Sequence, residues 1–576
     1  MIKDTNTSKV DRLKRYIGNA FTYDLFAGFT VAMVAIPQSM AYAAIIGINP
    51  IFGLYTAIIP AIIGSIFGKS TFLITGPTNA TALVTASVLL LSTKSDFYVE
   101  FVFFLAIIAG LVKLIIGLFK IGDIIRFVSN SVFTGFLTGA CLLIVLTQMT
   151  SLLGLSKASD PTLITNISHL LSSINKINIY VVITSLISIV TMLVIRKVNR
   201  NLPSSLIAII VTSCFVLFIN AEIHGISLVR DLGSVNPSIS FHLPLLPAPF
   251  PTFLIPGGLT IALISLLEST SISKSIAASS QQTIDLSKDF VGQGLASVAG
   301  GFFQCIPPSG SLARSAVAYR SNAKTPMTGV FSGLFVLLCL LLFARWIGYI
   351  PVACLAGIIV ISAISLIDQN QIKLIIKSRK ISLLVFITTL IMTLILPLQY
   401  GILIGIFLSS SIYMFESSRI HITQLKFDNH GNYFESPLPK NSSRVPECII
   451  VNIEGEMFFG ATEGIFDRLE GLLTSKTKVI IFRLRNARHL STTAVIELKK
   501  VIYKAKSSGI IPVFCGLSKE SLTLFKKSGL TQLIGKNSIF PAQPVIFDST
   551  RKALAFSKVI CNSKTTPRNF FVNNEY

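Results

Sequence analysis

Long apolar runs follow one another from residue 24 to residue 415 and constrain the fold of this chain more than any other feature. A helix needs about 20 apolar residues to cross the hydrocarbon core of a bilayer. Shorter apolar stretches lie at 78–92, 289–305 and 311–320, so we expect a mostly α-helical membrane protein with about 12–14 crossings. The clear candidate spans are 24–45, 51–67, 101–119, 127–149, 179–195, 203–220, 254–272, 327–347, 351–367, 380–397 and 400–415.

The composition excludes a soluble protein of this length. Only 13% of the residues are charged, whereas soluble domains carry about 25%. The formal net charge of +23 suggests nucleic-acid binding, but the lysines and arginines lie in short loops between apolar runs, where they face anionic lipid instead. The eight cysteines form no CxxC pair, so we expect no disulfide framework, no metal site and no cofactor.

The basic residues orient the chain in the membrane, because cytoplasmic loops are enriched in lysine and arginine. The N-terminus is basic and has no cleavable signal pattern. The predicted outside loops 93–100, 150–178, 221–253 and 345–350 carry few cations. Fourteen crossings then place both termini in the cytoplasm, and the compact loops favour a bacterial inner membrane. The predicted inside loops contain Lys69; Lys120 and Arg126; Arg196, Lys197 and Arg200; Arg320 and Lys324; and Lys373, Lys377, Arg379 and Lys380.

The chain changes character after its last apolar run. We expect a cytoplasmic N-terminal segment (1–23), a transport domain (24–418), a polar linker (419–446), a small α/β domain (447–562) and a polar tail (563–576). Alternating strand and helix patterns with short turns indicate the α/β class. The predicted strands are Cys448–Ile453, Val479–Leu484 and Ile510–Cys515, and the predicted helices are Thr462–Leu473, Thr492–Lys506, Lys519–Lys527 and Val545–Val559.

Two segments break the rules for membrane spans, Thr75–Thr81 and Gln304–Ser315. In each, glycine and proline end one element, and a short apolar helix follows. Backbone freed in this way is not tolerated against lipid, so it should line a cavity enclosed by protein. Two short, interrupted segments in corresponding halves indicate a transporter site built on inverted repeats.

The chemistry of these segments favours an anion. A helix N-terminus offers unpaired N–H groups and about half a positive charge, and two such termini can hold an oxyanion between them. Arg314 in the second segment would add a full positive charge. The alternative is that these are ordinary proline kinks and that Arg314 reaches out to the membrane surface.

Glu268 lies within the span 254–272, and a carboxylate at such a position is a functional hypothesis by default. Burial raises the pKa of a carboxyl group, so we expect Glu268 to couple proton movement to anion movement. The alternative is a structural ion pair with Lys274 or Arg314. Gln38 follows Pro37 at mid-span and can donate to an oxyanion, while Tyr42, one turn further on, either walls the pocket or simply packs.

The segment Gly64–Thr71 resembles a phosphate-binding loop. That motif needs four residues between its glycines and a preceding strand, whereas this segment has three residues there and ends a membrane span. We therefore interpret it as a cytoplasmic turn. With no other nucleotide motif, we expect a transporter that runs on ion gradients rather than an enzyme.

In these residues the chain resembles the sulfate permease (SulP) family of anion transporters. The matching pieces are Ile36-Pro37-Gln38, Pro50 with Gly53-Leu54-Tyr55, Gly76-Pro77, Glu268, and Arg314-Ser315-Ala316-Val317 after Pro307. The C-terminal part resembles a STAS domain, so the resemblance covers nearly the whole chain.

The resemblance implies fourteen spans as two inverted seven-span repeats, a core and a gate domain, a homodimer and an elevator movement of the core. It places the anion between the half-helices that begin at Thr78 and Leu312, near Gln38 and Tyr42. The expected binding residues are Gln38, Tyr42, Thr78, Asn79, Leu312, Ala313 and Arg314. Family members with an acid at the Glu268 position couple transport to protons or sodium, and glutamate favours protons.

Three departures from the family pattern affect these expectations. Thr78 stands where animal relatives often have an aromatic residue, which predicts a wider or more polar pocket. Ala313 replaces a frequent serine and removes a hydroxyl donor. In the STAS-like part, Ser491-Thr492-Thr493-Ala494 lacks the usual acid and glycine. Thr492 and Thr493 are therefore candidate phosphate acceptors, although a helix N-cap role for one of these hydroxyls is the simpler interpretation.

Proton-coupled sulfate symport is the leading hypothesis for function. Bicarbonate and dicarboxylates stay open as substrates, as does sodium as the coupling ion. A nucleobase permease shares the inverted repeats but has two mid-membrane acids and no STAS tail. A membrane anion sensor would give no flux, and a channel would give current without proton uptake.

Overall fold

The computed structural model divides the chain into two compact units, Met1–Ser409 and Ser410–Tyr576. The N-terminal residues before Tyr16 and the predicted tail 563–576 lie outside the residues that the structure describes. The described residues are 16, 18, 20–89, 95–122, 128–156, 163–199, 202–220, 223–233, 237–245, 247–248, 251–280, 285–418, 420–427, 432–439, 446–458, 460, 465–473 and 476–562.

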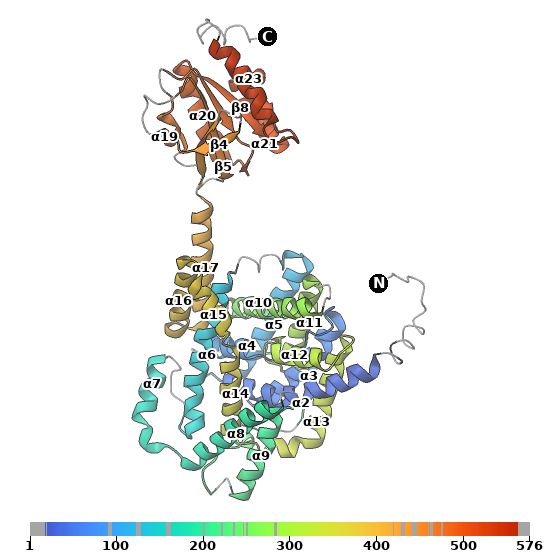
Figure 1. Ribbon diagram of the computed structural model, residues 1–576. Helices are drawn as coiled ribbons and strands as arrows, with labels where there is room; N and C mark the ends of the chain where they lie inside the picture. Colours follow the sequence, from blue (N-terminus) through green and yellow to red (C-terminus); the bar gives the residue numbers. More distant parts are fainter. Residues whose placement is uncertain are drawn as a thin grey trace. The chain divides into compact units, whose positions relative to one another are not determined.

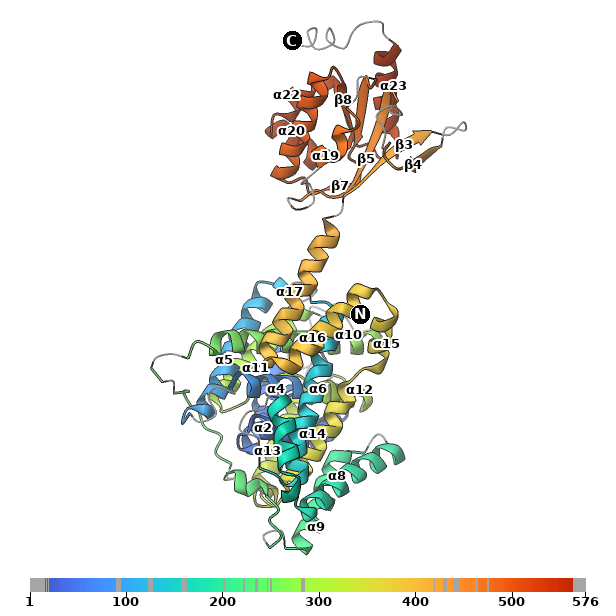
Figure 2. The ribbon, with the colours of Figure 1, turned by 90° about the vertical axis from the view of Figure 1, so that its left-hand side faces the viewer.

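The first unit is a bundle of helices, and a helix occupies every apolar stretch that the sequence indicates (Figure 1). The helices are α2 (Phe21–Ile46), α3 (Pro50–Phe67), α4 (Asn79–Val88), α5 (Tyr98–Leu118), α6 (Asn130–Leu153), α7 (Leu163–Ser172), α8 (Ile179–Val198), α9 (Ser204–Phe218), α10 (Leu254–Ser280), α11 (Leu286–Phe302), α12 (Leu312–Arg320), α13 (Met327–Ile347), α14 (Val352–Leu366), α15 (Gln369–Lys377), α16 (Lys380–Ile395) and α17 (Leu398–Ser417). Helices α8 and α9 pack side by side (Figure 2).

Eight helical segments in the described part of the chain are long and apolar enough to cross a membrane, and three shorter apolar helices accompany them. The predicted loops are more structured than expected. Helix α7 lies within the predicted outside loop 150–178, and α15 lies in the basic segment after α14. Both have apolar residues at helical spacing but are too short to span, so a search for long runs misses them. Fourteen crossings remain a prediction.

Helices α5 and α11 pack with their backbones in close approach. A Cβ atom added at Gly110 would lie 2.6 Å from the amide nitrogen of Val298, and one added at Gly294 would lie 2.7 Å from that of Leu114. The Ser297 hydroxyl donates to the Ala106 carbonyl oxygen at 2.8 Å. Small residues allow such contacts between membrane helices, and here they fix the buried face of α5.

The second unit is a sheet with helices on both faces (Figure 2). Among the described residues the strand order is β4-β3-β5-β6-β8-β9, and β7 pairs with β5. Strands β5, β6, β8 and β9 are parallel, and the hairpin β3–β4 is antiparallel. One apolar core packs under α19, α20, α21 and α22, and a second packs under α23. The strands are β3 (His421–Phe427), β4 (Tyr433–Ser436), β5 (Cys448–Glu456), β6 (Val479–Arg483), β7 (Ala487–Arg488), β8 (Ile511–Leu517) and β9 (Ile539–Pro541); the helices are α19 (Ile465–Glu470), α20 (Thr492–Ser507), α21 (Lys519–Lys527), α22 (Leu530–Ile534) and α23 (Asp548–Asn562).

The structure differs from the sequence prediction in the segment 419–446. This segment was expected to be a linker, but β3 pairs antiparallel with β5 and extends the sheet. Polar residues and prolines suggest a loop there, yet an edge strand tolerates polar side chains because only part of its surface is buried. The predicted helix Thr462–Leu473 contains α19 (Ile465–Glu470), residues 471 and 472 follow it as a turn, and Thr462 lies outside the described residues.

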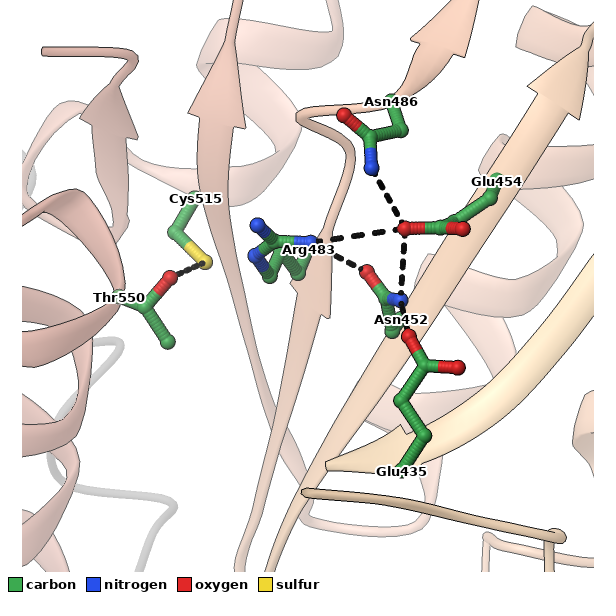
Figure 3. A network of polar contacts seen from close by, with 7 residues as sticks. All are labelled: Glu435, Asn452, Glu454, Arg483, Asn486, Cys515 and Thr550. Atoms are coloured by element: carbon green, nitrogen blue, oxygen red, sulfur yellow. Dashed lines mark hydrogen bonds and ion pairs between the residues drawn. The ribbon is translucent and has the colours of Figure 1, made fainter. Parts of the chain in front are cut away.

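A polar network ties the hairpin β3–β4 to the centre of this sheet (Figure 3). Arg483 is 6% exposed and donates to the Asn452 side-chain oxygen at 2.7 Å. Asn452 in turn donates to Glu435 at 2.9 Å and to Glu454 at 3.0 Å. On the other side of Arg483, burial raises the pKa of the Cys515 thiol to about 11. Because a buried cation is costly without partners, the network compensates the charge of Arg483.

Candidate functional site

The two interrupted segments meet in a short antiparallel ladder. Strand β1 (Thr75–Gly76) pairs with β2 (Ser309–Gly310), with Gly76 opposite Ser309. The Ser311 amide donates to the Ile74 carbonyl oxygen at 3.0 Å, and the Ile74 amide donates to the Ser315 hydroxyl at 3.0 Å. Helices α4 and α12 therefore begin from one shared, protein-enclosed connection, as the sequence predicts for this pair of segments.

Gly76 is required by the close approach of Arg314. A Cβ atom at Gly76 would overlap the Arg314 guanidinium. The following Pro77 has no amide hydrogen, so it cannot donate a backbone hydrogen bond within a helix. Thr78 then caps α4, since its hydroxyl oxygen accepts from the Thr81 amide at 3.4 Å. Local chemistry thus ends β1 and starts the half-helix within three residues.

Both half-helices present free amides at their first turns. In the part of the chain that the structure describes, the backbone nitrogens of Asn79, Ala80, Leu312 and Ala313 have no hydrogen-bond acceptor, as expected for the first residues of a helix. Thr78 is buried at 4% exposure, whereas Leu312 is 45% exposed. The side chain of the first residue of α12 is therefore accessible from open space.

Glu268 on α10 joins the two half-helices. One carboxylate oxygen, Oε2, accepts from the Thr78 hydroxyl at 3.0 Å and from the Ser309 hydroxyl at 2.8 Å. No ion pair of Glu268 occurs among the described residues, and Lys274 is exposed. Glu268 therefore forms no direct ion pair with Lys274 or Arg314 in the described structure.

Arg314 lies inside the protein, at 1% exposure. Its Nη2 donates to the Pro77 carbonyl oxygen, and its Nε is buried without an acceptor among the described residues. The alternative in which Arg314 reaches the membrane surface is wrong, because α12 points this side chain across the ladder toward the start of α4. A buried guanidinium with an unused N–H can donate to an anion.

Gln38 and Tyr42 lie on α2, which packs against both half-helices. Their exposures are 7% and 6%. The Gln38 side-chain oxygen has no donor within the described residues. Tyr42 interacts electrostatically with Arg314 and Glu268, so it lies beside the same cluster. The structure thus places the expected binding residues on α2 and at the starts of α4 and α12, which both pack against α2, without testing their roles.

Lys113 is a charged residue of this region that the sequence interpretation missed. It lies on α5, is 0% exposed, and its Nζ donates to the Pro308 carbonyl oxygen at 2.6 Å. The signal was present in the sequence, because Lys113 interrupts the apolar run 101–119. A lysine within a membrane span is as informative as a glutamate.

The turn between α3 and β1 confirms that Gly64–Thr71 is not a phosphate loop. The amides of Lys69 and Ser70 each donate to one carboxylate oxygen of Asp289 at 2.9 Å. An acceptor carboxylate occupies the position where a phosphate-binding loop would hold its anion. The turn therefore anchors the start of α11 instead.

The sequence of this chain is similar to known families and proteins. A sequence model of the sulfate permease family matches residues 21–389, and one of the STAS domain matches residues 440–552. The Bacillus subtilis protein YvdB is 29% identical, covering 92% of this chain and 98% of that protein. Sulfate transporter 4.1, chloroplastic, of Arabidopsis thaliana is 27% identical, covering 90% of this chain and 78% of that protein.

Structure comparison supports the same fold over both units. The murine Solute Carrier 26 family member A9 anion transporter, in its inward-facing state, superposes with a TM-score of 0.83 at 14% identity. The match covers 97% of this chain and 96% of that chain. At this identity the likeness concerns the fold alone.

Proposed function

This chain belongs to the sulfate permease family, and on that premise we propose that it is a proton-coupled carrier of a small oxyanion, with sulfate as first candidate. The observation that carries the proposal is the meeting of two half-helix N-termini at one ladder, with Arg314 buried beside them. The Arabidopsis thaliana relative, matched over 78% of its length, is named a sulfate transporter. Membership of a family of transporters supports a transporter rather than an enzyme.

The anion binds between the first turns of α4 and α12. The free amides of Asn79, Ala80, Leu312 and Ala313 donate to its oxygens, and each helix terminus adds about half a positive charge. Arg314 supplies a full charge, and Gln38 can donate from its amide nitrogen. Each helix terminus contributes about 1–2 kcal/mol, which suits a carrier because the anion must also leave.

Glu268 is the coupling acid in this proposal. Its carboxylate accepts from Thr78, the cap of α4, and from Ser309 in β2. An anion arriving between the half-helices raises the cost of a second negative charge there and favours proton uptake by Glu268. Anion and proton then move together when the core domain shifts against the gate in an elevator step.

Several wider features belong to the same proposal. We propose fourteen spans in two inverted repeats, a homodimer, a bacterial inner membrane and cytoplasmic termini. We also propose that the STAS domain regulates transport, with Thr492 and Thr493 as candidate phosphate acceptors. Ser491 caps α20 through a bond from the Ala494 amide at 3.2 Å, so neither threonine is needed as the cap, and Thr492 is exposed.

Flux in proteoliposomes tests this function. We expect labelled sulfate to accumulate when the pH is lower on the side from which it enters. Parallel assays with bicarbonate, fumarate and a sodium gradient identify the substrate and the coupling ion. They are needed because no residue of the site distinguishes oxyanions by their number of oxygen atoms. A channel would give voltage-driven current without proton uptake, and a sensor would give no flux; either result contradicts the proposal.

A further inference from the structure

A second buried cation lies near the two half-helices, and the coupling scheme above does not use it. Lys113 lies in the C-terminal half of α5, and its side chain is 0% exposed. A lysine within a membrane helix is energetically costly, so such residues generally have a function. Within the described residues its only hydrogen bond goes to the Pro308 carbonyl oxygen, at 2.6 Å.

That carbonyl connects Lys113 directly to the anion site. Pro308 precedes Ser309, whose hydroxyl donates to Glu268 Oε2 at 2.8 Å. Ser265, three residues before Glu268 on α10, also donates to the Pro308 carbonyl oxygen, at 3.3 Å. Lys113 interacts electrostatically with Glu268 itself. The ammonium is therefore linked through one carbonyl to the strand β2 that precedes α12.

The net charge of Lys113, Arg314 and Glu268 determines which charge on the anion makes the site neutral. With both basic side chains protonated, Lys113 and Arg314 interact electrostatically with one carboxylate, Glu268. They leave one positive charge unbalanced while Glu268 is ionised, and two when it is protonated. A divalent anion that enters with one proton on Glu268 cancels this charge completely. A monovalent anion that enters with the same proton leaves one uncompensated charge in a medium of low dielectric constant, which is costly.

We propose that Lys113 is the residue that selects a divalent oxyanion over a monovalent one. This inference rests on the proposed function, since it names the charge class of the anion held between α4 and α12. Lys113 does not touch the anion. Its positive charge acts on the anion through the electrostatic potential at the site, and its ammonium group holds the carbonyl of Pro308.

The size of the effect follows from Coulomb's law. As a scale, two opposite unit charges about 10 Å apart in a medium of effective dielectric constant about 20 attract each other enough for about a tenfold preference. Loss of the charge should therefore reduce the preference for a divalent anion by about tenfold, while leaving the half-helix amides in place.

The test uses two competitors against labelled sulfate uptake by the full chain in proteoliposomes. Selenate has the shape and charge of sulfate, and perchlorate has the same tetrahedral shape with one charge fewer. The readout is the ratio of their inhibition constants. In Lys113→Met and Lys113→Gln we expect this ratio to shift toward perchlorate by about tenfold. Lys113→Arg keeps the charge and should keep the ratio.

The variants separate charge from structure. Lys113→Gln keeps a donor for Pro308, so if Lys113 only positioned β2, this variant would restore the wild-type ratio, and that result overturns the proposal. Lys120→Gln removes a charge from the exposed end of the same region and is the matched control. A wild-type protein that carries no sulfate overturns the proposed function as well, whereas normal sulfate uptake with an unchanged ratio in both neutral variants overturns only the role of Lys113.

Discussion

Replacing Glu268 with glutamine should abolish proton-driven accumulation and preserve anion exchange. The glutamine has nearly the same shape, and its side-chain oxygen can accept from both hydroxyls that now donate to Glu268 Oε2, Thr78 at 3.0 Å and Ser309 at 2.8 Å. Two hydrogen bonds to a charged acceptor become neutral ones, at a cost of about 1 kcal/mol each. A folded domain is stable by about 5–15 kcal/mol, so we expect the variant to fold.

The functional magnitude follows from the proton gradient. With one proton per cycle and the membrane potential held at zero, one pH unit is worth about 1.4 kcal/mol and concentrates the anion about tenfold. Glu268→Gln has no proton to carry there, so the accumulation ratio should fall to one, while exchange of labelled for unlabelled sulfate continues.

The assay is uptake of labelled sulfate into proteoliposomes with a pH step, alongside exchange at equal pH. Glu100→Gln is the matched control, because among the described residues the Glu100 carboxylate bonds to His242 at 2.8 Å and to the Leu245 amide at 3.1 Å. Unchanged pH-driven accumulation in Glu268→Gln would refute the coupling role. Loss of exchange as well would mean that Glu268 maintains the structure of the anion site and does not couple anion movement to proton movement.

Three further perturbations test the packing around the site and in the STAS domain. Gly76→Ala should lower sulfate uptake while the protein still folds, because its Cβ would displace the Arg314 guanidinium; uptake and size-exclusion profiles measure the two effects. Gly294→Leu should destabilise the protein by about 1–3 kcal/mol by overpacking against Leu114, which a thermal-unfolding assay in detergent detects as a lowered Tm. Folding raises the pKa of Cys515 to about 11, so the unfolded state holds fewer protons between about pH 9 and 11, and stability should fall with rising pH there by up to about 1.4 kcal/mol per unit; Cys515→Ala should remove this part of the slope.

The helices of the membrane unit were predictable because a span is a local property of the sequence. Apolar length alone gives α5, α13 and α14, and the glycine and proline at Gly76-Pro77 give the start of α4 within one residue. Short amphipathic helices such as α7 were missed because they lack the length that this criterion requires. The strand β3 was missed because its stability comes from pairing with β5, a partner that its own residues do not reveal.

The site was predictable where a residue violates the rules for lipid contact. Glu268 and Arg314 were identified in this way, and Lys113 could have been, since it breaks an apolar run in the same manner. What the sequence could not give is the pairing itself. The common acceptor that Glu268 offers to Thr78 and Ser309 depends on contacts across 190 and 41 residues, which only the folded backbone brings into register.

Locating the bound anion tests the account most directly. Selenate replaces sulfate and scatters anomalously, so crystals of the full chain grown with selenate would reveal its position. We predict an anomalous peak within hydrogen-bond distance of the first-turn amides of both α4 and α12, beside Arg314. A selenate bound elsewhere, with those amides facing only water or protein, would contradict it.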